Sequence, residues 1–273
     1  MSQYKVIAAT GQHAGDRTTQ QDRIAIFATP KAPGYMMTVL AHGLGGGADG
    51  ALAAEQVIHT AKQLFEHFSP GVDNIESMLQ AIGHEAQQVL QLSSFSSKKH
   101  PQCSMVVLVI TPQQSAIWAH VGDARLYRFI GPNFAERTHD HSEDDGAANV
   151  SISFRRLDEK PQRRSGILLN VIGTGSNDLF VTVNRNDELK EGDAFILCSP
   201  GFWEYFDDTE LGAAIAMNTP REASEMLIRK ARERAAGSEA DNCSLAIVKL
   251  VAVPKEAKKY NIGHGRKSVP DTR

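Results

Sequence analysis

The sequence predicts an α+β fold in which two packed antiparallel β-sheets are flanked by pairs of helices. Three runs rich in Val, Ile, Tyr and Trp follow one another between residues 105 and 130, with short connections between them. Amphipathic stretches come in pairs, at 51–68 with 75–92 and again after residue 200. Strands grouped with strands, and helices with helices, favour a sandwich with outer helices over a βαβ repeat.

In the N-terminal half, we expect strands over residues 4–10, 24–27 and 35–41. The third of these apolar runs ends at His42, and a glycine-dense turn over residues 43–47 follows it. Because glycine lacks a Cβ atom, such a turn lets the backbone approach a ligand closely. The sequence therefore places His42 at the edge of a sheet, just before a helix.

The next three expected strands are 105–111, 116–121 and 125–130. Gly122 and Asp123 have the chemistry of a hairpin turn, which would make the last two strands antiparallel neighbours in one sheet. Further strands are expected over 167–172, 179–183, 193–198 and 244–253. Two helices follow residue 200, and the second begins at Thr219, with Pro220 at its first position and Glu222 completing a capping box.

Length and composition indicate one large domain over residues 1–253 and a flexible basic tail over 254–273. The net charge of −3 gives no reason to expect a nucleic acid as partner, and no apolar run approaches the ~20 residues of a membrane span. The N-terminus has no signal-peptide layout. The three cysteines lie in or beside apolar runs, so we expect buried free thiols and a cytoplasmic location.

Polar residues recur where expected strands end. Taken singly, each has an ordinary structural explanation, as a turn cap or as a buried histidine with a satisfied hydrogen bond. Their order along the chain carries more information. The residues and motifs in question are Arg17-Thr18-Thr19-Gln20-Gln21-Asp22, Leu40-Ala41-His42-Gly43-Leu44-Gly45-Gly46, Val121-Gly122-Asp123-Ala124-Arg125-Leu126-Tyr127, Asp140-His141-Ser142, the run from Gly192 to Trp203, and Asp241-Asn242-Cys243-Ser244.

This order resembles the metal-dependent protein phosphatases of the protein phosphatase 2C family over residues 5–250. The resemblance implies two antiparallel sheets between helix layers, with the site at one end. It also implies a pair of Mg²⁺ or Mn²⁺ ions that activate water for hydrolysis of a phosphomonoester. By the same resemblance, Arg17 would hold the phosphate and Asp22 would orient metal-bound water. Gly43 and Asp241 would be metal ligands, and Asp123 would serve a third, weaker metal site.

The departures from the family pattern concern the metal ligands. His42 replaces the aspartate that bridges both ions, and Pro200 replaces a second ligand with a side chain that has no donor atom. Gln20 replaces an asparagine, and the segment 143–164 does not resemble the family's flap. An imidazole does not bridge two ions as a carboxylate does, and it favours softer metals than Mg²⁺. We therefore expect Mn²⁺ or Mg²⁺ to bind weakly or not at all.

Two hypotheses follow. The favoured one is a degenerate phosphatase domain, a pseudophosphatase that binds a phosphoprotein or another signalling partner. The alternative is an active Ser/Thr phosphatase with a re-ligated metal site. In that case His42, Asp22 and Asp241 would hold an unusual metal, helped by His13, Asp49 or the run 139–141, which otherwise is part of a solvated acidic loop.

Overall fold

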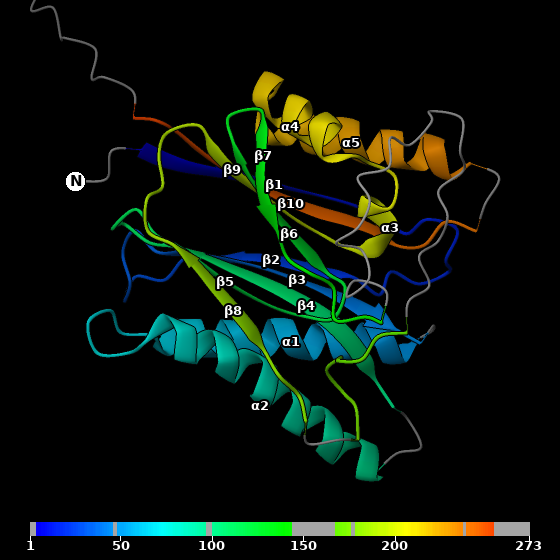
Figure 1. Ribbon diagram of the computed structural model, residues 1–273. Helices are drawn as coiled ribbons and strands as arrows, with labels where there is room; N and C mark the ends of the chain where they lie inside the picture. The colour runs from blue at the N-terminus through cyan, green and yellow to red at the C-terminus, as the bar shows by residue number, and fades with distance from the viewer. Residues whose placement is uncertain are drawn as a thin grey trace, which may run out of the picture.

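Two five-stranded antiparallel sheets lie face to face between two layers of helices (Figure 1). The computed structural model describes residues 4–45, 48–96, 100–143, 167–175, 178–236 and 239–253. The order in the first sheet is β1 (Tyr4–His13), β10 (Cys243–Ala252), β9 (Asp193–Cys198), β6 (Arg125–Ile130) and β7 (Asn133–Arg137). In the second sheet it is β2 (Arg23–Phe27), β3 (Met36–Leu44), β4 (Gln102–Ile110), β5 (Ala116–Val121) and β8 (Thr182–Asn186).

The helices cover the outer faces of both sheets. The long helices α1 (Ala48–His67) and α2 (Ile75–Ser96) lie on the second sheet, and α4 (Asp208–Met217) and α5 (Pro220–Ala235) lie on the first (Figure 1). A single turn, α3 (Pro200–Trp203), follows β9. The predicted sandwich is confirmed.

Three apolar clusters correspond to the three interfaces between these layers. Leu40, Leu126 and Leu197 belong to the cluster between the two sheets. Phe65 and Leu79 are among the residues that join α1 and α2 to the second sheet, and a third cluster lies beneath α3–α5. Because polar side chains are costly inside such layers, functional groups are left to the ends of the strands.

The glycine-dense turn begins later than the sequence predicts. β3 continues through His42 and Gly43, which pair with Ser104 and Cys103 of β4. Gly43 lies directly against the first turn of α1, where a Cβ atom would collide with the Gly50 backbone. The missing side chain therefore lets the helix α1 approach the strand closely.

The predicted hairpin at Gly122 and Asp123 is wrong. β5 pairs with β4 and β8 in the second sheet, whereas β6 pairs with β7 and β9 in the first. The two residues therefore carry the chain from one sheet to the other. Gly122 has a positive φ of 86° and packs against Ser104, so the turn needs glycine for both its conformation and its space.

Other boundaries differ in smaller ways. The capping box of α5 is confirmed, with Thr219 and Glu222 each bonding the other's backbone. β7 and α3 were not predicted. The run 167–172 forms two isolated bridges, at Leu168 and Ile172, in place of a strand. Gly46, Gly47, almost all of the segment 143–164 and the predicted tail 254–273 lie outside the described residues.

Within the described residues, no helix is long and apolar enough to cross a membrane.

Candidate functional site

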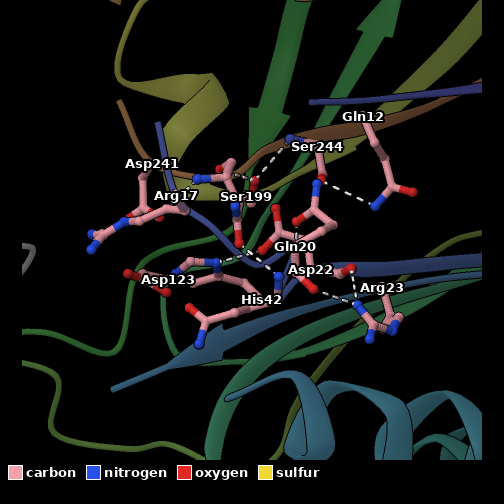
Figure 2. Close-up of polar contacts among 12 residues, drawn as sticks. Gln12, Arg17, Gln20, Asp22, Arg23, His42, Asp123, Ser199, Asp241 and Ser244 are labelled. Carbon is pink, nitrogen blue, oxygen red and sulfur yellow. Dashed lines mark hydrogen bonds and ion pairs between the residues drawn. The ribbon is translucent and has the colours of Figure 1, made fainter. Parts of the chain in front are cut away.

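The structure gathers the predicted site residues at one end of the two sheets. Asp22 directly precedes β2, His42 lies near the end of β3, and Asp123 lies between β5 and β6. Asp241 precedes β10, and Arg17 lies on the loop that follows β1. Figure 2 shows these side chains together. The loops come from both sheets, so this end of the sandwich brings together residues that are more than 200 positions apart.

His42 and Asp22 form a buried ion pair at the centre of the group. The His42 Nδ1 atom lies 2.7 Å from Asp22 Oδ1, and the two side chains are 8% and 0% exposed. Burial alone lowers the pKa of His42, but the Asp22 carboxylate outweighs this, and Asp123 and Asp241 add to it, so that the pKa rises to about 9. The imidazole therefore stands where a bridging carboxylate was expected, and it is cationic at neutral pH.

Two buried carboxylate oxygens at the site have no hydrogen-bond partner among the described residues. They are Oδ2 of Asp22 and Oδ1 of Asp123. Burial raises the pKa of Asp123, and the charge of His42 opposes that rise. Such oxygens are costly to bury unpaired, so they mark a position where water or a cation would be favourable.

Arg17 and Asp241 form a second ion pair, nearer the surface. Arg17 Nε and Nη2 donate to the two carboxylate oxygens of Asp241 at 3.1 and 3.0 Å. Although burial raises the pKa of Asp241, the hydrogen bonds from Arg17 and from the Asn242 backbone hold it below its ordinary value. The carboxylate that family resemblance assigns to a metal is thus bound in a bidentate way by a guanidinium of the same chain.

Asn242 holds the loop that carries Arg17, and the sequence reasoning did not single it out. Its side-chain Oδ1 accepts from the Gln21 backbone at 2.7 Å, and its Nδ2 donates to the carbonyls of Ala14 and Thr19. It is fully buried. Its place beside Asp241, at the start of an apolar run, was the available signal, because a buried amide there must find partners.

Pro200 and Gln20 occupy the remaining positions that differ from the family. Pro200 opens α3 directly after Ser199, and its ring offers no donor atom to the site. Ser199 ties β9 to β10, since its hydroxyl accepts from the Ser244 backbone at 3.1 Å. Gln20 accepts from the Asp22 backbone through Oε1 at 3.0 Å, so its side chain fixes the local turn.

The run 139–141 is built into the scaffold. Asp140 accepts from Arg125 Nε and Nη2 at 2.7 and 2.6 Å, and the Arg125 guanidinium lies over the Trp203 ring. His141 packs against His120 and accepts or donates through both ring nitrogens to neighbouring groups. Burial and the charge of His120 lower the pKa of His141 to about 4.

The comparisons with known proteins point to one family, although no family model matches the chain. The protein phosphatase PhpP of Streptococcus pneumoniae serotype 2 is 25% identical over 242 residues, which cover 86% of this chain and 93% of that protein. A putative protein phosphatase 2C-type of Streptococcus pyogenes serotype M6 is 26% identical over 249 residues, covering 85% and 92%. The predicted resemblance to the protein phosphatase 2C family is confirmed.

Solved structures of phosphatases share the fold of this 2C-like domain. The serine/threonine phosphatase of S. agalactiae superposes with a TM-score of 0.76 at 20% identity, over 90% of this chain and 99% of that one. The catalytic domain of the phosphatase PstP, solved in complex with 2 manganese ions, gives a TM-score of 0.71 at 18% identity, over 90% and 98%.

Two of the carboxylates that the family resemblance assigns to the metal site are already paired with cations of this 2C-like domain. Hard divalent cations are held by several carboxylate and carbonyl oxygens. Here Asp22 is paired with His42, Asp241 with Arg17, and Pro200 contributes no donor. Over the described part of the chain, no three His, Cys, Asp or Glu side chains are grouped so as to hold a metal ion.

Proposed function

We propose that this 2C-like domain binds a phosphorylated Ser/Thr protein in signalling and hydrolyses it weakly or not at all. One observation carries the proposal: two of the three carboxylates that would serve the metals or their bound water, Asp22 and Asp241, are already paired with a cation of the chain. Arg17 remains a side chain suited to a phosphoryl group, because a guanidinium binds phosphate in a bidentate way.

The size of the catalytic task supports the loss of hydrolysis. Phosphate monoesters are among the slowest compounds to hydrolyse, and enzymes accelerate the reaction by up to ~10²¹-fold. That acceleration uses two ions held about 3.5–4 Å apart, which clamp the attacking and leaving oxygens. With an imidazole at the bridging position and a proline at a ligand position, we expect Mn²⁺ or Mg²⁺ to bind too weakly at cellular concentrations.

The test is to restore the ligands. Hydrolysis of p-nitrophenyl phosphate is measured with Mg²⁺, Mn²⁺, Zn²⁺ and EDTA, and Mn²⁺ binding is measured by calorimetry. The wild type is expected to show little turnover, and His42→Asp combined with Pro200→Asp should gain Mn²⁺ affinity and part of the activity. The control is His59→Asp, which makes the same histidine-to-aspartate replacement at an exposed position of α1. Brisk wild-type turnover with Mn²⁺ would overturn the proposal.

An active phosphatase with an altered metal site is the second candidate. The buried, unpartnered oxygens of Asp22 and Asp123 favour it, since each would gain a partner from a bound cation. Of the additional ligands that this hypothesis names, His13 accepts from the Gly15 backbone at 2.9 Å, Asp49 lies in the first turn of α1, and Asp140 is held by Arg125. Turnover that depends on Zn²⁺ and is lost in Asp123→Asn would establish this candidate.

The cellular setting belongs to the same proposal. Cys103, Cys198 and Cys243 are free and buried, and burial raises the pKa of each thiol, so they are inert packing residues. We infer a cytoplasmic location and a phosphoprotein or regulatory protein as partner. The division into a domain over 1–253 and a basic tail over 254–273 stays a prediction.

A further inference from the structure

The backbone around Arg17 is held by hydrogen bonds, whereas the Arg17 side chain is exposed to solvent. The Asn242 amide bonds the carbonyls of Ala14 and Thr19, one on each side of Arg17, at 2.8 and 3.2 Å. The Arg17 backbone also donates to the Ala14 carbonyl. The Arg17 side chain is 44% exposed, and its hydrogen bonds within the described part of the chain go to Asp241.

Asp241 is held independently of Arg17. Its Oδ1 atom accepts from the Asn242 backbone at 2.7 Å, so the carboxylate keeps a partner when the guanidinium leaves. The side chain is 34% exposed, which allows water to replace the bonds from Arg17. A pair exposed to this degree contributes little net free energy, because solvent screens the charges and two side chains must be immobilised.

We propose that Asp241 acts as an internal competitor for Arg17, presenting to the guanidinium the same pair of oxygens that a phosphomonoester presents when it binds. This inference rests on the proposed function, since it takes Arg17 as the phosphate-binding side chain. A bound phosphoserine or phosphothreonine then displaces the Asp241 carboxylate. The phosphoryl group carries a charge of about −1.5 to −2 at neutral pH, against −1 for the carboxylate, so it is the stronger partner.

Asp241 weakens phosphate binding in two ways. It occupies the Nε and Nη2 edge of Arg17 in the free domain, and after displacement it leaves a negative charge beside the bound phosphoryl group. Asp241→Asn removes the negative charge and the Oδ2 atom that accepts from Arg17 Nη2, and it keeps Oδ1, which accepts from the Asn242 backbone. From the modest strength of exposed ion pairs and of charge repulsion near the surface, we expect a gain in affinity of about threefold to tenfold.

The experiment measures binding of a fluorescent phosphothreonine peptide to the full chain by anisotropy in EDTA, with inorganic phosphate as competitor. Asp241→Asn should bind about threefold to tenfold more tightly than the wild type. Arg17→Ala should abolish binding, and Asp241→Asn should give no gain in the Arg17→Ala background. Thermal melting confirms that each variant is folded. Phosphate competition shows that the phosphoryl group, and not the peptide, is recognised.

The matched control is Asp187→Asn. Asp187 is also an exposed aspartate paired with an arginine, Arg185, and its replacement changes the net charge by the same amount. It follows β8 and lies away from the site, so the variant should bind as the wild type does.

The outcomes separate this inference from the proposed function. If the wild type binds the peptide and Asp241→Asn binds no more tightly, the competitor role is wrong and the proposed function stands. If only Asp241→Asn binds, the competitor role stands and wild-type phosphoprotein binding is overturned. If a gain persists without Arg17, or if no variant binds, the inference is overturned.

Discussion

Two buried ion pairs from neighbouring strand ends differ in how completely they are satisfied. Arg125 and Asp140 make two short hydrogen bonds, and the guanidinium also covers the Trp203 ring. His42 and Asp22 make one contact, and the second oxygen of Asp22 has no partner among the described residues. The first pair has the properties of a structural clamp. The second is incomplete at the place where the resemblance to the 2C family predicts metal ligands.

This difference separates an ion pair that supports the fold from an ion pair at the candidate site. A fully bonded buried pair is costly to break but needs nothing further. An incompletely bonded pair keeps an oxygen that can accept a hydrogen bond or bind a ligand. If nothing binds there, the unpaired oxygen lowers the stability of the fold. In this 2C-like domain the clamp residues Arg125 and Asp140 match the family motifs, while His42 and Pro200 stand at positions where the resemblance predicts metal ligands.

Removing one partner of each buried ion pair should give the largest changes in the free energy of unfolding. It directly tests the difference between the two pairs. Arg125→Met should lower the free energy of unfolding by about 4 kcal/mol, because it leaves Asp140 buried without its two bonds. His42→Leu should cost about 2 kcal/mol, since Asp22 loses a single hydrogen bond. Both are measured by urea unfolding at pH 7 in EDTA. Arg185→Met, which breaks an exposed pair, is the control. Equal costs for the two buried variants would refute the distinction.

A smaller effect is expected on how the free energy of unfolding depends on pH, through His141, the residue that follows Asp140. His141 has a pKa lowered to about 4 in the fold, against about 6.5 in the unfolded chain, because it is partly buried beside His120. The unfolded state therefore binds more protons between these values. The stability that the neutral imidazole contributes is fully present above pH 6.5 and is lost as the pH falls toward 4.

The variant His141→Gln isolates this dependence. Because the ring is only partly buried, we expect the stability of the wild type relative to His141→Gln to fall by about 1 kcal/mol from pH 7 to pH 4.5. Urea unfolding at a series of pH values measures it. Parallel pH profiles for the two proteins would show that His141 does not titrate as described.

The smallest expected effect lies away from both pairs. Thr219→Ala removes the hydroxyl that accepts from the Glu222 backbone at the start of α5, and it should cost about 1 kcal/mol in urea unfolding. Phosphopeptide binding should stay at the wild-type level. A change in binding would mean that α5 is coupled to the site, and the separation of scaffold from site would need to be abandoned.

Local sequence rules predicted correctly those features that depend only on residues within one helix or strand. The capping box at Thr219 and the strands 116–121, 125–130 and 193–198 depend on nearest neighbours and on apolar patterning, and the structure has them. The order of the motifs was enough to predict the sandwich and the family, because that order reflects the whole chain.

Rules of short range failed at Gly122 and Asp123. A connection of only three residues, 122–124, normally implies a hairpin. Here each flanking strand finds its partners elsewhere, β5 with β4 and β8, and β6 with β7 and β9, so the connection crosses between sheets. The roles of His42 and Asn242 likewise depend on groups about 20 and 220 residues away in the chain.

The sequence by itself predicted the layers, the resemblance to the 2C family and the two positions, 42 and 200, that depart from its expected metal ligands, because these follow from residue types and their order. Only the tertiary structure decided which side chains pair with the site carboxylates Asp22 and Asp241. The pairing of Asp22 with His42 and of Asp241 with Arg17 depends on distances between loops of different sheets, and no pattern along the chain encodes those distances.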